Sequence, residues 1–161
     1  MKTKKLLLVM SLLFLIIGIG CEEEKTEKQI RLKGFSYSEC KGEVSSTLKI
    51  SASSSIDLQE YIEYKGMGDH YLHIKHVNVP FNCCPDTIKA SASLIRNEIA
   101  VKEEEMGPKC NCICRYDLEY KIGPLLSKEY LFVLKENAEE SVRFNFIFSS
   151  VLDNKYIIER K

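Results

Sequence analysis

Cysteine is the residue type that offers the most chemistry in this chain. The 161 residues include seven cysteines, and Cys110, Cys112 and Cys114 lie at alternate positions. Such a run could hold a soft metal ion, undergo redox chemistry or supply disulfide partners. Alternate residues of a strand lie about 6.6 Å apart, whereas thiolates that share a metal lie within about 4 Å of each other. We therefore predict disulfides, with a metal-handling or thiol-redox site at Cys110, Cys112 and Cys114 as the alternative.

Histidine and glutamate residues form a second set of candidate ligands. His70, His73 and His76 lie in or beside segment 71–81, which has the pattern of a strand. A strand places His70 and His76 about 20 Å apart and His73 on the opposite face, so the three cannot share one ion. We expect surface or cross-strand histidines. We also expect the three consecutive glutamates at 103–105 to form a solvated rim near a turn.

Sequence motifs typical of enzymes are absent. The chain has no Gly-x-Ser-x-Gly elbow, no His-Glu-x-x-His pair and no glycine-rich phosphate loop. It also has no tryptophan, the most common platform for stacking on sugars, although tyrosine can take that role. We therefore expect no enzymatic activity and no cofactor. A binding or structural accessory role remains, with a protein or a glycan as the unidentified partner.

The first twenty residues have the pattern of a signal peptide. Lys2, Lys4 and Lys5 precede an apolar run at 6–17, and small residues lead to Cys21. The segment from residue 6 to residue 20 is shorter than the roughly 20 residues that a helix needs to cross a bilayer. We therefore predict that residues 1–20 direct export and are removed.

The Gly20-Cys21 junction resembles that of bacterial lipoprotein precursors, with Gly18 where those precursors usually have leucine. The resemblance implies that Cys21 carries the lipid and holds the protein on a membrane. Residues 21–27, which include three consecutive glutamates, are predicted to be an acidic tether. This acidic run also resembles the surface-export signal of lipoproteins in the Bacteroidota. It implies an outer-membrane location, either surface-exposed or facing the periplasm.

Charge composition argues against a nucleic-acid partner. The 23 basic and 23 acidic residues balance over the whole chain, and three of the lysines belong to the predicted signal peptide. The remaining chain is slightly acidic and has no block of lysine and arginine. Nucleic-acid binding depends on neutralising phosphates, which such a surface does poorly.

The number of cysteines agrees with a lipidated Cys21. Setting Cys21 aside leaves an even set, which suits three disulfides in an oxidising compartment. Residues two apart in a strand are seldom close enough to bridge, so each cysteine at 110, 112 and 114 is expected to pair outside that run. Six of the fifteen connectivities remain open. The six disulfide candidates are Cys40, Cys83, Cys84, Cys110, Cys112 and Cys114.

Hydropathy alternates with a period of two from residue 28 onward. The clearest example is Cys114–Ile122, where even positions are apolar and odd positions are charged, followed by Val142–Phe148. An all-β fold follows: a single antiparallel β-sandwich (immunoglobulin-like) over residues 28–161, with a β-barrel as the alternative. Residues 137–141 could form a helical turn. Further strands are expected at 29–33, 47–52, 56–64, 71–81, 88–95, 99–103, 130–135 and 156–159.

Two further resemblances concern the predicted domain. Asp86-Thr87-Ile88 is similar to the acceptor for protein O-glycosylation in Bacteroidota, which makes Thr87 a candidate glycosylation site. The segments at 82–85 and 110–118 resemble those of small Bacteroidota lipoproteins with a Cys-rich, sandwich-like domain. That group implies export and anchoring but no particular activity.

Overall fold

The computed structural model describes residues 30–42 and 59–160, and this part of the chain contains strands and no helix. The predicted signal peptide, the acidic tether with Cys21 and the predicted strand at 47–52 lie outside the described residues. No helix of the described part is long and apolar enough to cross a membrane. Its strands are β1 (Arg31–Tyr37), β2 (Tyr61–Gly66), β3 (Leu72–Asn82), β4 (Thr87–Ile95), β5 (Glu98–Met106), β6 (Ile113–Gly123), β7 (Glu129–Glu136), β8 (Glu139–Ile147) and β9 (Asp153–Ile157).

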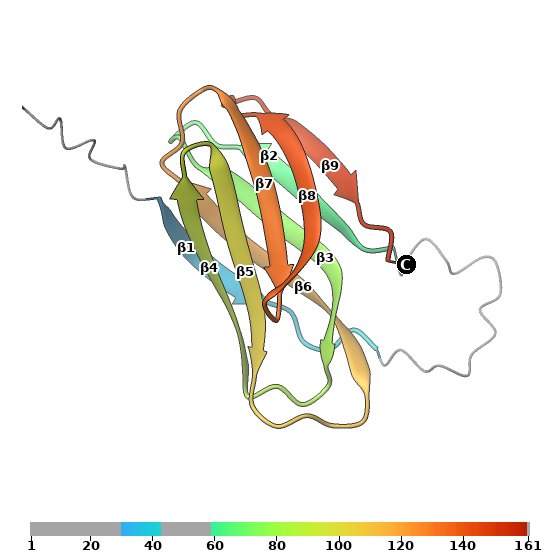
Figure 1. The fold of residues 1–161 in the computed structure, drawn as a ribbon. Coiled ribbons are helices and arrows are strands. Elements are labelled where there is room, and N and C mark those ends of the chain that lie inside the picture. The colour runs from blue at the N-terminus through green and yellow to red at the C-terminus, as the bar shows by residue number, and fades with distance from the viewer. Residues whose placement is uncertain (1–29, 43–58, 161) are drawn as a thin grey trace, which may run out of the picture.

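These strands form two sheets that pack face to face (Figure 1). One has the order β1-β6-β3-β2-β9 and the other the order β4-β5-β7-β8. The predicted β-sandwich is confirmed, and the described strands do not close into a barrel. One pair departs from the antiparallel expectation, because β5 and β7 run parallel. The reason is the path of the chain: β6 returns through the opposite sheet, so β7 starts again from the end where β5 started.

Alternation of side chains places the core between the sheets. In β6, Cys114, Tyr116, Leu118, Tyr120 and Ile122 are all buried, as the sequence pattern predicts. From the opposite sheet come aromatic rings of β7 and β8, which stack with centroids 5.0 Å apart for Phe132 and Phe144. Such offset ring pairs add to the free energy of burying the rings themselves. The core is therefore built from inward positions on both sheets.

A β-bulge interrupts β3 directly after His76. His76 pairs with Leu118 of β6, but the next pair along the two strands is Val79 with Tyr116, so β3 has one extra residue. Asn78 lies in the bulge and has a φ of 63°, in the left-handed region that asparagine adopts more readily than most residues. The extra residue reverses which positions face inward. Even residues before the bulge and odd residues after it point into the core.

The connection between β7 and β8 is a two-residue hairpin turn. Asn137 and Ala138 both have positive φ, 46° and 77°, as a type I′ turn requires. Glu136 already pairs with Glu139 across this turn. The expectation of a helical turn over 137–141 is therefore wrong, because strand pairing continues up to the turn and leaves no residues for a helix.

The sandwich has two ends that carry different features. We call the first the entry end: the described chain begins there at Ile30, and it contains the loops at 67–71, 96–97, 124–128 and 148–152. We call the second the disulfide end: it contains the loops at 83–86 and 107–112. Figure 1 shows these ends at the top and bottom of the molecule.

Candidate functional site

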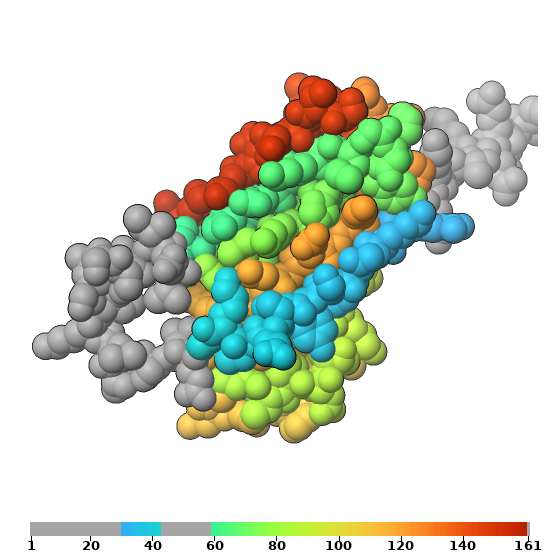
Figure 2. Space-filling model, turned by 180° about the vertical axis from the view of Figure 1, so that it is seen from behind, coloured from blue at the N-terminus to red at the C-terminus, as the bar shows by residue number. Residues whose placement is uncertain are grey.

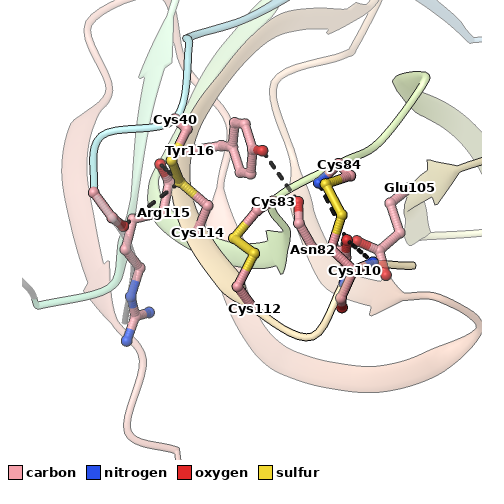
Figure 3. The surroundings of a disulfide bond; sticks show 11 residues. Cys40, Asn82, Cys83, Cys84, Glu105, Cys110, Cys112, Cys114, Arg115 and Tyr116 are labelled. Carbon is pink, nitrogen blue, oxygen red and sulfur yellow. Dashed lines mark hydrogen bonds between the residues drawn. A yellow bond between two sulfur atoms is a disulfide. The ribbon is translucent and has the colours of Figure 1, made fainter. Parts of the chain in front are cut away.

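Three disulfides connect the described cysteines at the disulfide end. They join Cys40 to Cys114, Cys83 to Cys112 and Cys84 to Cys110, with Cα–Cα distances of 5.6, 5.7 and 5.8 Å. These separations are within the range that a disulfide needs. Each cysteine of the 110–114 run thus pairs outside that run, as the sequence predicts. Figure 3 shows the three bridges next to one another.

Backbone geometry around the cysteine run differs from the sequence-based expectation. Only Cys114 belongs to a regular strand, where it is fully buried. Cys110 and Cys112 lie in the loop before β6, and Cys84 is exposed after the end of β3. Because this backbone is a loop and not an extended strand, Cys110 and Cys112 can reach the adjacent Cys84 and Cys83.

Asn82 holds the two cysteines of the Cys84–Cys110 disulfide in place. Its Oδ1 accepts hydrogen bonds from the backbone N–H groups of Cys84 and Cys110, at 3.1 and 2.8 Å. Its Nδ2 donates to the carbonyl of Cys110 at 2.7 Å. The backbone of Asn82 is held too, because its N–H donates to Glu105 and its carbonyl accepts from the Tyr116 hydroxyl. One amide side chain therefore fixes the loop that the bridges enclose (Figure 3).

A second polar group lies inside the sandwich, between the two sheets. We call it the buried ionic cluster. It contains residues from both sheets and from the segments just before β2 and just after β9. Its members are Glu60, His76, Glu103, Tyr120, Glu136 and Arg160.

His76 is at the centre of the buried ionic cluster and is fully buried. Its Nδ1 lies 2.8 Å from Glu103 Oε2, and its Nε2 lies 3.0 Å from Glu60 Oε1. Because a carboxylate faces each ring nitrogen, both nitrogens act as donors and the ring is an imidazolium. Burial alone would lower the pKa of His76, but the charge of Glu103 and the hydrogen bonds to both carboxylates raise it to about 10. Tyr120 donates to the other oxygen of Glu103 at 2.7 Å.

Arg160 links the C-terminal segment to this cluster. Its Nε and Nη2 each donate to one oxygen of Glu60, and Nη2 also donates to Glu136 at 2.7 and 2.9 Å. Burial raises the pKa of Glu60, but hydrogen bonds to His76 and Arg160 outweigh it, and the net pKa is lowered. The guanidinium therefore holds two carboxylates from different parts of the chain.

The carboxylates of the buried ionic cluster are balanced by a protonated His76, by Arg160 and by Arg115, which lies beside the cluster. Three carboxylates, those of Glu60, Glu103 and Glu136, face the imidazolium and the guanidinium of Arg160. Arg115 supplies a third cation, with Nη1 3.7 Å from Glu60 Oε2. Buried charges persist only when they are paired and hydrogen-bonded, as the imidazolium of His76 and the carboxylates of Glu60 and Glu103 are. The cluster thus joins both sheets and the end of β9 through interactions that break if one member is lost.

Glu60, His76 and Glu136 also have the geometry of a candidate metal site, because one ligand atom from each lies within 4.8 Å of the others. However, Arg160 bridges Glu60 and Glu136, and carboxylates engage both nitrogens of His76. A metal ion would have to displace the guanidinium and deprotonate the imidazole. The arrangement therefore suits an internal charge network rather than a cation site.

The structure corrects two sequence-based expectations at this cluster. His76 is not a surface residue but fully buried, and Glu103 is not part of a solvated rim, since its side chain has no exposed surface. Glu104 does lie at the surface, where it pairs with Lys102. The cross-strand expectation is confirmed for His73, whose Nε2 lies 2.8 Å from Glu119 on β6. Thr87, the glycosylation candidate, is the first residue of β4 and is half-buried.

The sequence contained a signal for these residues that apolar periodicity alone did not reveal. In β5, Ile99 and Val101 face the core, and Glu103 continues their alternation. Glu136 continues the inward alternation of β7 in the same way, and His76 that of β3. A polar residue at the next inward position of an apolar alternation is thus an indication of a buried polar network.

Figure 2 shows the outer face of the five-stranded sheet, with its strands lying next to one another. Ion pairs run across its strands, among them Lys65 with Asp153 and Lys155 with Glu63. A shallow recess of about 300 Å³ lies on this face. It is lined by Ser36, Tyr37, Ser38, Lys75, Asp117 and Glu119. Hydroxyls, carboxylates and an accessible tyrosine ring suit a polar ligand.

Comparison with known proteins gives no relative for this chain: no family model, no curated protein and no solved structure matches it.

Protonation of His76 predicts how stability depends on pH. Its pKa is about 10 in the folded protein and 6.5 for an ordinary histidine, so the folded state binds the extra proton between these values. The stabilisation is fully present below about pH 6.5 and is lost as the pH rises toward 10. We expect urea midpoints to fall steadily from pH 6.5 to 9.5.

Two variants test the origin of this slope. His76→Gln should flatten it, because the titrating group is gone. His73→Gln should keep it, since His73 pairs with Glu119 at the surface and does not belong to the cluster. A slope as steep in His76→Gln as in the wild type would contradict the assignment to His76.

Proposed function

We propose that this protein is an exported accessory domain that is anchored to a membrane by lipid on Cys21 and that binds or supports another molecule rather than catalysing a reaction. The observation that carries the proposal is the pairing of the six described cysteines into three disulfides. Disulfides persist outside the reducing cytoplasm. Export also agrees with the signal-peptide pattern of residues 1–20.

Membrane attachment follows from the Gly20-Cys21 junction. A lipidated cysteine carries two or more acyl chains, and two chains suffice for stable anchoring. We propose the outer membrane as the location, with the domain either surface-exposed or facing the periplasm. The partner is a protein or a glycan, and the polar recess beside Tyr37 is a surface where it could bind.

The alternative function, metal handling or thiol redox at Cys110, Cys112 and Cys114, is not favoured by the disulfides. Each of these cysteines is bonded to a different partner, which leaves no thiolate in the run to act as a ligand or nucleophile. Stoichiometric zinc or copper in protein purified without an oxidant, together with six free thiols, would favour the alternative instead.

Lipid labelling tests the proposed anchor. In cells fed labelled palmitate, we expect the wild-type protein to take up label and to partition into detergent. Cys21→Ala should do neither, because the acceptor sulfur is missing. Cys84→Ala is the matched control, since it removes a different cysteine and should leave the label unchanged. Label that persists in Cys21→Ala would contradict anchoring at this residue.

A further inference from the structure

Exposed apolar side chains are distributed unevenly between the two ends of the sandwich. The four that are more than half exposed all lie at the entry end: Ile95 at 64%, Leu126 at 55%, Ile147 at 69% and Val151 at 86%. The other large apolar side chains exposed in the described part of the chain are less than half exposed. Single exposed apolar residues are common on protein surfaces, but such a concentration at one end indicates contact with another apolar phase.

Backbone hydrogen bonds hold the loops that carry these residues together. The N–H of Phe148, next to Ile147, donates to the carbonyl of Lys128 in the loop of Leu126. The N–H of Leu131 donates to Asn97, in the turn beside Ile95. The loop of Val151 is joined to β2 through the hydrogen bond from Gly66 to Leu152. The four side chains, two at the ends of β4 and β8 and two in the loops beside them, therefore belong to one connected part of the entry end.

The chain reaches the domain at this same end. Arg31 pairs with Gly123, the last residue of β6, directly before the loop that contains Leu126. Eight residues lie between Cys21 and Ile30, and the nine residue steps that join these two span at most about 30 Å. Strand β3, with 11 residues, extends over about 36 Å toward the opposite end. Lipid on Cys21 would thus be close to the entry end and far from the disulfide end.

We propose that the entry end rests on the lipid bilayer in which Cys21 is anchored, with the side chains of Ile95, Leu126, Ile147 and Val151 inserted at its surface. This inference rests on the proposed lipid anchor. Tethering makes contact with the bilayer an intramolecular event, so even a small apolar area suffices. Exposed apolar side chains enter the boundary between headgroups and acyl chains without requiring a complementary partner surface. In this orientation the disulfide end points away from the membrane.

Tryptophan fluorescence can test this orientation, because the chain has no tryptophan of its own. The probe is Val151→Trp in the full-length lipidated protein, reconstituted in phosphatidylcholine vesicles with brominated acyl chains. Direct contact with lipid should shift its emission to the blue and lower the intensity about twofold relative to unbrominated vesicles. Met106→Trp is the matched control at the disulfide end, where Met106 is 44% exposed, and it should show neither change. Leu126→Trp provides a second reporter at the entry end.

Vesicle flotation separates the failure of this inference from the failure of the anchor. Protein that does not float with the vesicles contradicts the anchor itself. Protein that floats, but shows no more quenching at Val151→Trp and Leu126→Trp than at Met106→Trp, overturns the proposed orientation and leaves the anchor standing. A third outcome would also overturn the proposed orientation: a blue shift that grows with protein concentration and is not accompanied by bromine quenching. A second copy of the chain, rather than lipid, would then cover these side chains.

Discussion

Removal of the Cys40–Cys114 disulfide should lower the free energy of unfolding by about 4 kcal/mol. The bond joins residues 74 apart in sequence, so it limits the unfolded chain more than the other two bonds do. It also fixes β1, which among the described strands has β6 as its only neighbour in the sheet. We propose Cys40→Ser combined with Cys114→Ala, since Cys40 is exposed and Cys114 is buried. Urea unfolding of this variant and the wild type gives the difference.

The other two disulfides provide the control, because one is nested within the other. Cys84–Cys110 closes 26 residues inside the 29 that Cys83–Cys112 closes. Either bond alone keeps nearly the same loop closed, so replacing one pair by serine should cost about 2 kcal/mol or less. Replacing both pairs should cost more than the sum of the single losses. If replacing one of these two nested disulfides lowered the free energy of unfolding as much as removing Cys40–Cys114, loop closure would not be the origin of the stabilisation.

Local alternation explains why much of the fold could be predicted from sequence. In β6 each inward residue from Cys114 to Ile122 is apolar and each outward one from Arg115 to Lys121 is charged, so the strand and its buried face are determined locally. Disulfide geometry likewise disfavours bonds between residues two apart in a strand, because such residues are seldom close enough to bridge. This reasoning restricted the partners of Cys110, Cys112 and Cys114 to Cys40, Cys83 and Cys84. It did not choose among the partners, because that depends on which strands become neighbours.

Strand order is the information that local patterns do not contain. Glu103 and Glu136 lie side by side because β5 and β7 pair in parallel, and the two strands are separated in sequence by the whole of β6. His76 faces them only from the opposite sheet. Nothing near Glu103 in the sequence indicates that a histidine 27 residues earlier will neutralise it. For this reason, the sequence pattern at 103–105 predicts a solvated rim instead of a buried Glu103.

The bulge in β3 is a second feature that local patterns did not reveal. A strict period of two through segment 71–81 puts residues 76, 78 and 80 on one face. The structure instead buries Val77 and Asn78 next to His76, and then turns Val79 and Phe81 inward. Side-chain contacts from distant segments fix Asn78 in its left-handed conformation. Its N–H donates to Asp117, and its Oδ1 accepts from Lys41.

Loss of the Glu103 carboxylate should be about as destabilising as loss of the longest-range disulfide. In Glu103→Leu, His76 loses the carboxylate that most favours its charge, and the buried hydroxyl of Tyr120 loses its acceptor. Removing one partner of a buried ion pair costs about 3 to 5 kcal/mol, because the other charge is left without compensation. We expect a decrease of this size in the free energy of unfolding from urea titrations at pH 7.

Glu104→Leu is the matched control for this variant. Glu104 is the next residue of the same strand, and its carboxylate pairs with Lys102 at the surface, 2.6 Å away. Exposed ion pairs contribute little, so this substitution should change stability by about 1 kcal/mol or less.

Glu103→Gln adds a more conservative test, because it keeps the size of the side chain and an acceptor for Tyr120 but removes the charge. Without that charge the pKa of His76 in the folded protein falls, so the alkaline loss of stability should still begin near pH 6.5 but should end at a lower pH, and be smaller in total, than in the wild type. Equal destabilisation by Glu103→Leu and Glu104→Leu, together with an unchanged pH profile in Glu103→Gln, would mean that the cluster does not hold the two sheets together as described.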